Sequence, residues 1–225
     1  MKKALKIMGV SLTALIIIVL IYAAYVFICY YRLDDNIELT PDNSAAASHV
    51  PTGEELSVTS WNIGFGAYTD RYSFFMDGGK YSRGLSEETV LDTVRKITDD
   101  LSSFDSEFYF IQEIDVDATR SYHINEYAMI AEKFQNKSRV YAQNYDSPYL
   151  FYPILKPHGK SVAGLVTISD YNITSALRRS LPVQSGFAKF LDLDRCYTIN
   201  RIPTDNGKEL ILINFHLSAY TTDPA

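Results

Sequence analysis

The sequence has few cysteines and no excess of positive charge. Its two cysteines are Cys29 and Cys196, and Cys29 lies in an apolar run near the N-terminus, which excludes a disulfide within the rest of the chain. The formal net charge is -6. This excludes binding to nucleic acid through a diffuse basic surface, because that mode requires clustered lysine and arginine. An enzyme that meets one phosphate at a time in a charged cleft is still compatible with this charge.

The composition is otherwise that of a globular protein. Of the 225 residues, 47% are hydrophobic and 21% are charged, which is typical of a chain that forms one packed core. The sequence shows no internal repeat, so a solenoid or a propeller is not expected.

A long uncharged segment follows the first lysines. Residues 7–31 form a run of 25 residues without charge between Lys6 and Arg32, and as a helix they exceed the roughly 30 Å hydrocarbon core of a bilayer. We therefore predict a transmembrane anchor. A cleaved signal peptide is the alternative, but its apolar region is usually shorter and ends at an A-x-A-like site, which is not found here.

The charges on the two sides of this run predict its orientation. Three lysines lie within residues 1–6, and three acidic residues lie within residues 34–38. The positive-inside tendency places residues 1–6 in the cytoplasm. The chain is thus expected to be a single-pass protein of the cell membrane, with everything after Arg32 outside the cytoplasm.

The segment after the anchor and the remaining chain differ in pattern. Residues 32–55 are polar, contain two prolines and show no sustained apolar period, so they are predicted to be a linker that tethers the domain to the anchor. Residues 56–225 are predicted to be one domain. Its elements are expected in the order strand (56–62), helix (86–101), strand (107–113), helix (125–134), and then strands at 161–169, 171–177, 195–204 and 209–217. This order predicts an α/β (α+β) fold with a mixed sheet covered by helices.

Three of the expected strands end in a polar residue, namely Asn62, Glu113 and His216. Binding sites of open α/β sheets form at strand ends, because the strands fix the backbone while the loops leave room for a ligand. Mg²⁺ takes oxygen ligands, commonly one or two carboxylates with water and substrate phosphate. Glu113 is therefore expected to bind the metal, with Asn62 assisting, and His216 to hydrogen-bond or protonate a phosphoryl oxygen.

Each of these residues also has a structural interpretation. Asn62 precedes Ile-Gly and fits a turn residue, because asparagine caps turns and tolerates left-handed conformations. Glu113 alone fits a solvated strand end. His216 alone fits a structural histidine, since no H-x-x-x-H spacing surrounds it. Only the combination of the three favours a site.

Four stretches, in this order, resemble the endonuclease/exonuclease/phosphatase superfamily. They are SWNIGFGAY (60–68), FYFIQEIDVDATRSY (108–122), KSVAGLVTISDYNI (160–173) and LILINFHLSAY (210–220). The resemblance covers about residues 56–221. It implies a four-layer α/β sandwich of two mixed sheets flanked by helices, and a phosphoesterase that depends on Mg²⁺ or Mn²⁺.

The resemblance also implies roles for five residues. Glu113 matches the glutamate that binds the metal, Asn62 the asparagine that helps to hold metal and phosphate, and His216 the histidine that contacts the scissile phosphate. Arg120 is expected to contact substrate phosphate, with a structural salt bridge as the alternative. Asn214 lies on the same strand face as His216; it is assigned to substrate phosphate, with hydrogen bonding in the core as the alternative.

The sequence departs from the family after the last of these motifs. The family's G-D-x-N and S-D-H motifs do not follow, so we expect this chain to be the N-terminal portion of a longer protein. Residues 33–225 alone are then expected to be inactive and poorly soluble. The full-length parent is expected to hydrolyse phosphoesters of nucleic acid or phospholipid, with no protein partner evident. The alternative is a non-catalytic, surface-exposed binding module that keeps the fold.

Two features bear on the choice of substrate. Arg178 and Arg179 form a small basic spot, which a nuclease would use on flanking nucleotides. The stretch DRYSFFMDGG, with Tyr72, Phe74, Phe75 and Met76, is compatible with an apolar loop near a bilayer, as a lipid phosphodiesterase would need. Core packing explains these aromatic residues equally well.

Overall fold

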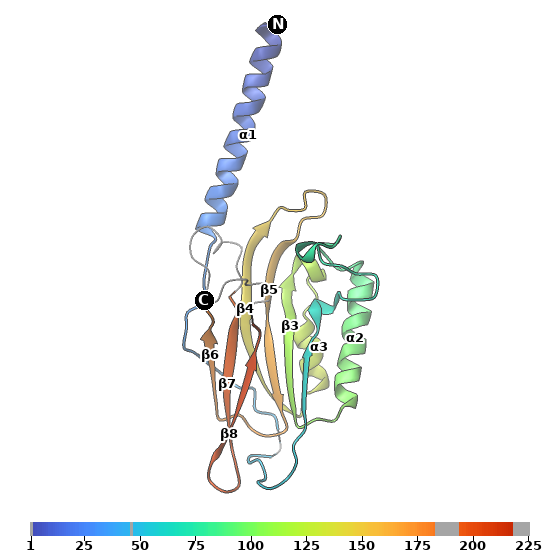
Figure 1. Cartoon of the computed structure of the whole chain (residues 1–225), viewed down its shortest axis with the longest axis vertical. Helices are drawn as coiled ribbons and strands as arrows, with labels where there is room; N and C mark the ends of the chain where they lie inside the picture. The colour runs from blue at the N-terminus through green and yellow to red at the C-terminus, as the bar shows by residue number, and fades with distance from the viewer. Residues whose placement is uncertain (1, 46, 183–193, 218–225) are drawn as a thin grey trace. The chain divides into compact units, whose positions relative to one another are not determined.

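The structure is a computed structural model, and it describes residues 2–45, 47–182 and 194–217. The chain divides into two units, residues 1–31 and residues 32–225. The described part of the first unit contains one helix. The second unit contains all of the strands that the structure describes (Figure 1). The end of the fourth family-like stretch, residues 218–220, lies outside the described residues.

The first unit contains helix α1 (Lys2–Ile28), which has no buried residue. This helix is long and apolar enough to cross a membrane, although a signal sequence near the N-terminus passes the same test. Its C-terminal end lies three residues before the predicted limit at Tyr31. Length and composition thus agree with the predicted anchor, while the orientation stays a prediction.

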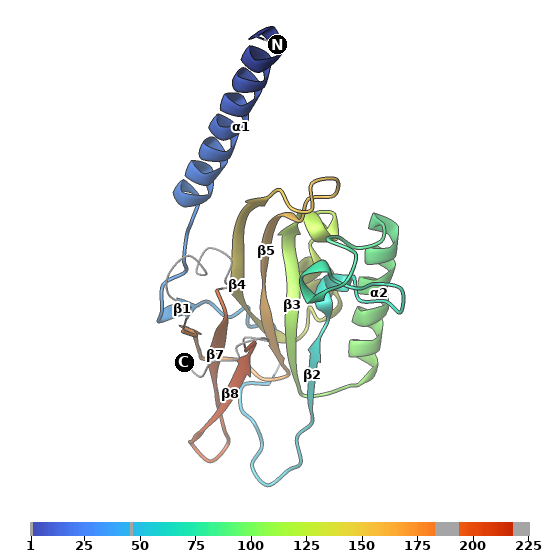
Figure 2. The same cartoon turned by 45° about the horizontal axis from the view of Figure 1, so that its top comes forward.

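The second unit contains two four-stranded sheets (Figure 2). The first sheet has the order β2 (Val58–Asn62), β3 (Phe108–Ala118), β5 (Gly159–Ser169), β4 (Ser138–Leu150). Only its pair β2 and β3 is parallel. The second sheet is antiparallel and has the order β1 (Ile37–Leu39), β6 (Ser175–Ser180), β7 (Cys196–Pro203), β8 (Glu209–Phe215).

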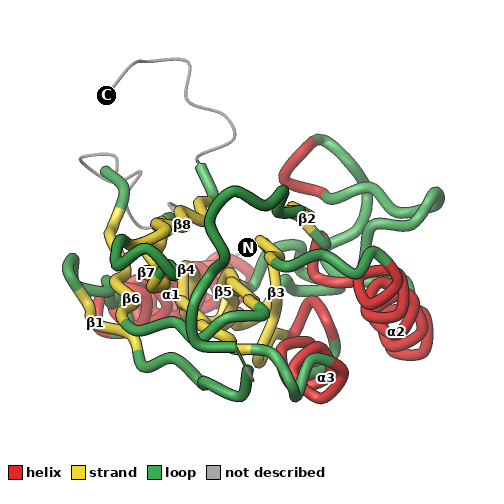
Figure 3. The backbone as a smooth tube through the Cα atoms, turned by 90° about the horizontal axis from the view of Figure 1, so that it is seen from below, coloured by secondary structure: helices red, strands yellow, loops and turns green. Residues whose placement is uncertain are grey.

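The elements stack in layers, as Figure 3 shows from below. Helices α2 (Glu87–Ser103) and α3 (Glu126–Lys133) cover one face of the first sheet, where Leu101 and Ile130 pack against Ile111. The other face meets the second sheet, where Phe108 packs with Ile202. Three short 3₁₀ helices complete the described part: η1 (Gly64–Gly66), η2 (Phe75–Asp77) and η3 (Thr119–Ser121). The predicted fold class, two sheets with flanking helices, is confirmed.

Helix α2 forms where the sequence predicts it. The hydroxyl of Ser86 accepts a hydrogen bond from the backbone N–H of Thr89, which caps the first turn. Glu87 and Glu88 occupy that turn, where acidic side chains stabilise the positive end of the helix dipole. Its buried residues recur at helical spacing: Val90, Val94, Ile97, Thr98 and Leu101.

The segment expected to be a linker is instead part of the domain. Within residues 32–55, β1 pairs with β6, Asp42 forms an ion pair with Arg139, and Val50 is buried. The sequence gives no period here because the segment contributes single contacts at intervals rather than one continuous apolar face. The linker prediction is therefore wrong for most of this range.

Strand β4 is an element that the sequence analysis did not predict. Its buried positions include polar side chains such as Arg139, Asn144 and Ser147. Strand prediction from sequence depends on alternating apolar residues, and this strand satisfies buried polar groups with hydrogen bonds instead. Arg139, for example, donates to the carbonyl oxygens of Phe134 and Lys137.

The outer face of the second sheet carries exposed apolar side chains. Along β8, Leu212 and Asn214 point inward and are buried, while Ile211, Ile213 and Phe215 alternate with them and are exposed. No helix of the described residues covers this face. The described part of the domain therefore shows three of the four layers that the resemblance implies.

Candidate active site

The predicted site residues lie at one edge of the first sheet. Strand β2 runs parallel to β3, and both β3 and β4 run antiparallel to β5. Strands β2, β3 and β4 therefore run in the same direction, and their carboxyl ends share one edge, which we call the site edge. Asn62 is the last residue of β2, and its pairing partner Gln112 directly precedes Glu113 on β3. The two predicted metal ligands are thus neighbours.

Glu113 lies in a β-bulge. The pairing of β3 with β5 shifts register between Ile111 and Ile114, and Glu113 has φ 56°. A positive φ is costly for a residue other than glycine, and bulges of this kind re-aim a side chain next to active sites. The Glu113 side chain is 24% exposed, although its neighbours Ile111 and Ile114 are fully buried. The bulge thus presents one carboxylate at the site edge.

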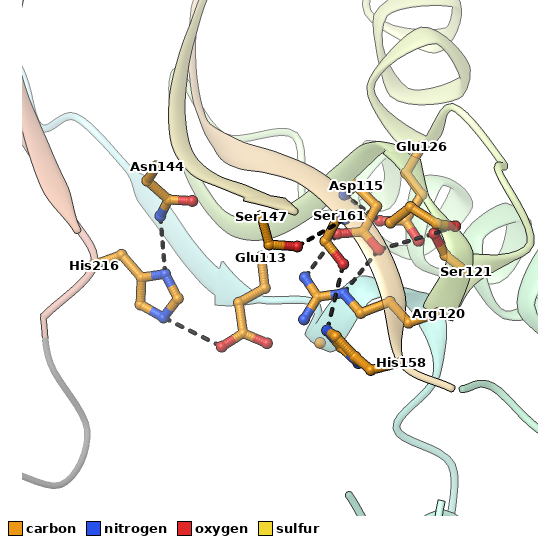
Figure 4. Close-up of polar contacts among 12 residues, drawn as sticks. Glu113, Asp115, Arg120, Ser121, Glu126, Asn144, Ser147, His158, Ser161 and His216 are labelled. Carbon is orange, nitrogen blue, oxygen red and sulfur yellow. Dashed lines mark hydrogen bonds and ion pairs between the residues drawn. The ribbon is translucent and has the colours of Figure 1, made fainter. Parts of the chain in front are cut away.

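His216 reaches the same carboxylate from the second sheet. It directly follows β8, and its Nε2 lies 3.2 Å from Oε1 of Glu113 (Figure 4). The amide Nδ2 of Asn144 lies 3.1 Å from Nδ1 of His216. If Nδ1 accepts this amide hydrogen, Nε2 carries the ring hydrogen and donates it to Glu113. Arg195 also contacts the His216 ring and adds positive charge. Asn144 and Arg195 were not identified from the sequence, because neither residue belongs to a motif or pattern that indicates a site.

The surroundings of Glu113 keep its carboxyl ionised. Burial raises its pKa, but the hydrogen bond with His216, the charge of Arg120 and the hydrogen bond with Asn62 outweigh burial and lower the pKa to about 2. A carboxyl that stays charged at neutral pH is suited to binding a cation. Glu113 therefore fits the predicted metal ligand.

Asn62 makes two side-chain contacts, one with the turn that follows β2 and one with Glu113. Its Oδ1 accepts a hydrogen bond from the backbone N–H of Gly64 at 3.0 Å, which is the turn-capping role. Its side chain also hydrogen-bonds Glu113. One asparagine thus closes the turn after β2 and contacts the candidate metal ligand.

Arg120 is placed as in the alternative interpretation, a structural salt bridge. Its Nε and Nη2 donate to the two carboxylate oxygens of Asp115 at 3.0 and 2.7 Å, and its guanidinium lies 3.9 Å from the ring centre of Phe65. The residue is only 8% exposed. The prediction of a direct phosphate contact is not supported by this position, because the forked donors are already used. Its charge instead acts on Glu113 from behind the site edge.

Asn214 likewise takes its alternative role in the core. It is 1% exposed, its Oδ1 accepts from Nε2 of Gln112 at 2.8 Å, and its Nδ2 donates to the Val166 carbonyl at 2.9 Å. This arrangement corrects the assignment to substrate phosphate. The contacts join β8 to the first sheet, and they fix the strand end that carries His216 against the residue that precedes Glu113.

A buried polar cluster behind the site edge was not identified from the sequence. Asp115 is fully buried and accepts hydrogen bonds from Arg120 and from the Ser121 hydroxyl. The carboxyl of Glu126, also fully buried, accepts the backbone N–H of Asp115 at 2.9 Å. Burial and the neighbouring Asp115 raise the pKa of Glu126 well above its usual value. The sequence signal that could have indicated this cluster is the close spacing of Asp115, Arg120 and Ser121 after Gln-Glu.

His158 lies in the β4–β5 loop and is buried. Burial and the charge of Arg120 lower its pKa to about 4. The folded state therefore binds the proton more weakly than the unfolded chain, and stability falls as pH falls from about 6.5 toward 4. We expect about 2 kcal/mol of stability to be lost between pH 7 and pH 5 through this group. Urea unfolding at both pH values should show a smaller loss in His158→Gln, and an equal loss would contradict this assignment.

The described residues fit a magnesium site of the open kind. Among residues 2–45, 47–182 and 194–217, no group of three or more His, Cys, Asp or Glu side chains is arranged to hold a metal ion. Mg²⁺ often uses one or two carboxylates and completes its shell with water and substrate phosphate. The ionised Glu113, with the Asn62 amide beside it, satisfies this lower requirement.

Comparison with known proteins gives one structural similarity. No family model matches the sequence, and no curated protein matches it. The structure is similar to a crystal structure described as an endonuclease/exonuclease/phosphatase from Beutenbergia cavernae DSM 12333, with a TM-score of 0.50 and 16% sequence identity. The match covers 72% of this chain but 38% of that chain, so this chain spans well under half of the length of that structure. The similarity shows that the domain shares the fold of that structure.

Proposed function

We propose that this chain carries part of the active site of a membrane-anchored, outward-facing phosphoesterase that depends on Mg²⁺ or Mn²⁺. The observation that supports this function best is the carboxylate of Glu113, held ionised on a bulge and in contact with His216, on a fold shared with an endonuclease/exonuclease/phosphatase. The apolar helix α1 supports the anchoring.

The proposed roles follow from the contacts of each side chain. Glu113 and Asn62 would hold the metal ion, which supplies positive charge that polarises a phosphoryl oxygen. Nε2 of His216 lies 3.2 Å from Oε1 of Glu113 in the structure. With the ring hydrogen on Nε2, His216 can donate it to a phosphoryl oxygen that arrives beside the carboxylate. Arg195, in contact with His216, adds positive charge where negative charge develops.

Metal binding by the chain tests the first step of this proposal. Mn²⁺ is expected to bind the full chain in detergent, and Glu113→Gln is expected to weaken binding by about tenfold or more, because it removes the charge of the main ligand. The measurement is the free Mn²⁺ signal in electron paramagnetic resonance. Glu107→Gln is the matched control, since Glu107 lies before the amino end of the same strand and accepts hydrogen bonds from Ser57. Equal binding by both variants would contradict the assignment of Glu113.

The substrate class is a separate question. The protein as the cell makes it should be assayed on single- and double-stranded DNA beside phospholipid vesicles, with release of nucleotide or headgroup as the readout. Turnover on either substrate supports the phosphoesterase and identifies its class. Metal binding at Glu113 without turnover on any phosphoester would favour the alternative, a binding module that keeps the fold.

A further inference from the structure

The loop between β4 and β5 exposes a group of large apolar side chains at its end. Phe151, Tyr152, Ile154 and Leu155 flank Pro153, and all four are more than half exposed, with Ile154 at 84% and Leu155 at 96%. We call these four residues the apolar tip. Single exposed apolar residues are common, but a contiguous apolar patch marks a surface that binds another apolar surface.

The apolar tip rests on a second loop that adds to it. In this loop, the ring of Phe75 packs against that of Tyr152 at a tilt of 46°, with ring centres 5.8 Å apart, and the neighbouring Met76 is exposed. The base of the tip is braced by hydrogen bonds: the Lys156 carbonyl accepts from Ser82, and the Pro157 carbonyl accepts from Arg83 at 2.7 Å. These hydrogen bonds fix the backbone of the loop directly after the exposed apolar side chains.

The two loop segments that form and support the tip carry a net charge opposite in sign to that of the whole chain. Residues 70–83 and 151–160 contain five basic residues and two acidic ones, a net charge of +3, whereas the chain carries -6. The basic residues are Arg71, Lys80, Arg83, Lys156 and Lys160. Apolar side chains together with basic residues suit the surface of an anionic bilayer, because the negative surface potential attracts the basic side chains.

The segment that leads from α1 joins the domain at the site edge. Arg32 pairs with Asp194 at 2.9 Å. The guanidinium of Arg178 donates to the carbonyl oxygens of Asp34 and Gln143 at 2.9 and 2.8 Å. Gln143 and Ile114 both pair with Gly164 on β5. The joining segment therefore lies level with Glu113.

The tip lies beyond the level of Glu113, toward the carboxyl end of β4. From the pair Gln143 and Gly164, strand β5 runs five residues to Gly159, which pairs with Leu150 directly before the tip. Five strand residues correspond to about 16 Å. Only residues 29–31 connect the end of α1 at Ile28 to Arg32. The tip thus projects from the end of the domain at which the candidate anchor is attached.

We propose that the apolar tip binds the surface of the anionic bilayer in which α1 is anchored. This inference rests on the anchoring in the proposed function, but not on catalysis. Ile154 and Leu155 enter the headgroup region, and the surrounding lysines contact lipid phosphates. The consequence is that the site edge, with Glu113 and His216, faces the membrane rather than the bulk solvent.

Tryptophan probes in the full chain test this contact. Three variants, Ile17→Trp, Leu155→Trp and Asn206→Trp, are reconstituted separately into phosphatidylcholine and phosphatidylglycerol vesicles, and emission is compared with and without brominated acyl chains. Emission of the parent, which contains Trp61, is subtracted. Leu155→Trp is expected to shift to the blue and to lose roughly half of its emission, because insertion of about 5–10 Å brings the indole near the bromines. Asn206 lies in the β7–β8 turn at the opposite end of the domain and is the matched control without quenching.

The three probes separate failure of the tip from failure of the anchor. Quenching of Leu155→Trp with an unquenched Asn206→Trp supports the proposal. Quenching of Ile17→Trp alone overturns the tip contact and leaves the anchor intact. Quenching of none of the probes overturns both, and equal quenching of Leu155→Trp and Asn206→Trp overturns the tip as the specific contact. Leu155 is almost fully exposed, so its replacement does not disturb the core.

Discussion

Replacing Asp115 by asparagine is expected to lower the free energy of unfolding of the domain by about 3–5 kcal/mol. Asp115 is fully buried and accepts both forked donors of Arg120. Asparagine has nearly the same shape but no charge, so the guanidinium would be left buried without its counterion. Removing one partner of a buried ion pair is far more costly than the net contribution of the pair.

A matched control lies two residues along the same strand. Oδ1 of Asp117 lies 2.6 Å from Nδ1 of His123, and both side chains are more than half exposed, so Asp117→Asn should change stability by less than about 1 kcal/mol. Urea unfolding of both variants at neutral pH gives the comparison. Similar stabilities for the two variants would mean that Arg120 finds another partner or solvent, and that the cluster does not support the site edge.

In the protein as the cell makes it, Glu113→Gln is expected to reduce the rate of metal-dependent phosphoester hydrolysis about 100-fold or more. Lewis-acid stabilisation by a bound metal is worth several kcal/mol, and a 100-fold loss corresponds to about 2.7 kcal/mol. Glutamine keeps the shape of the side chain but removes the charge that holds the cation. The rate is measured at saturating Mg²⁺ on the substrate identified by the assays above.

Stability distinguishes loss of chemistry from loss of folding in this variant. Glu113 is partly exposed and lies on a strained bulge, so Glu113→Gln should unfold at nearly the same urea concentration as the parent protein. Glu107→Gln, on the same chain segment, should keep full activity. A Glu113→Gln variant that retains most of the activity would remove Glu113 from the metal site and with it the main support for the proposed function.

The buried cluster and the site edge form one electrostatic unit. The charge of Arg120 contributes to the low pKa of Glu113, while its own donors are held by Asp115. The residue that resembles a phosphate ligand in the sequence thus has another effect here. It keeps Glu113, the candidate metal ligand, ionised without facing the substrate. No linear motif distinguishes this positioning role from direct contact with a substrate phosphate.

The sequence by itself determined the elements with strong periodicity and the residues at strand ends. Capping, alternation and length are local patterns that depend on neighbouring residues alone. They predict the N-capped helix α2, the strands β2, β3, β5, β7 and β8, and the apolar helix α1. Asn62 and Glu113 could be placed near each other from sequence, because they end the two predicted strands 56–62 and 107–113, which are separated by one helix, and this order favours a parallel pair. In the structure β3 continues past Glu113 to Ala118.

Only the tertiary structure decided how the polar residues are used. Strand β4 and the contacts of residues 32–55 depend on buried hydrogen bonds and ion pairs, which leave no period in the sequence. Arg120 and Asn214 carry the right chemistry for phosphate, but burial against Asp115 and Gln112 commits them to the core. His216 meets Glu113 across 103 positions of sequence (216 minus 113) through the packing of two sheets. Local pattern fixes the elements of this domain, and the partners of each polar group depend on contacts between distant segments.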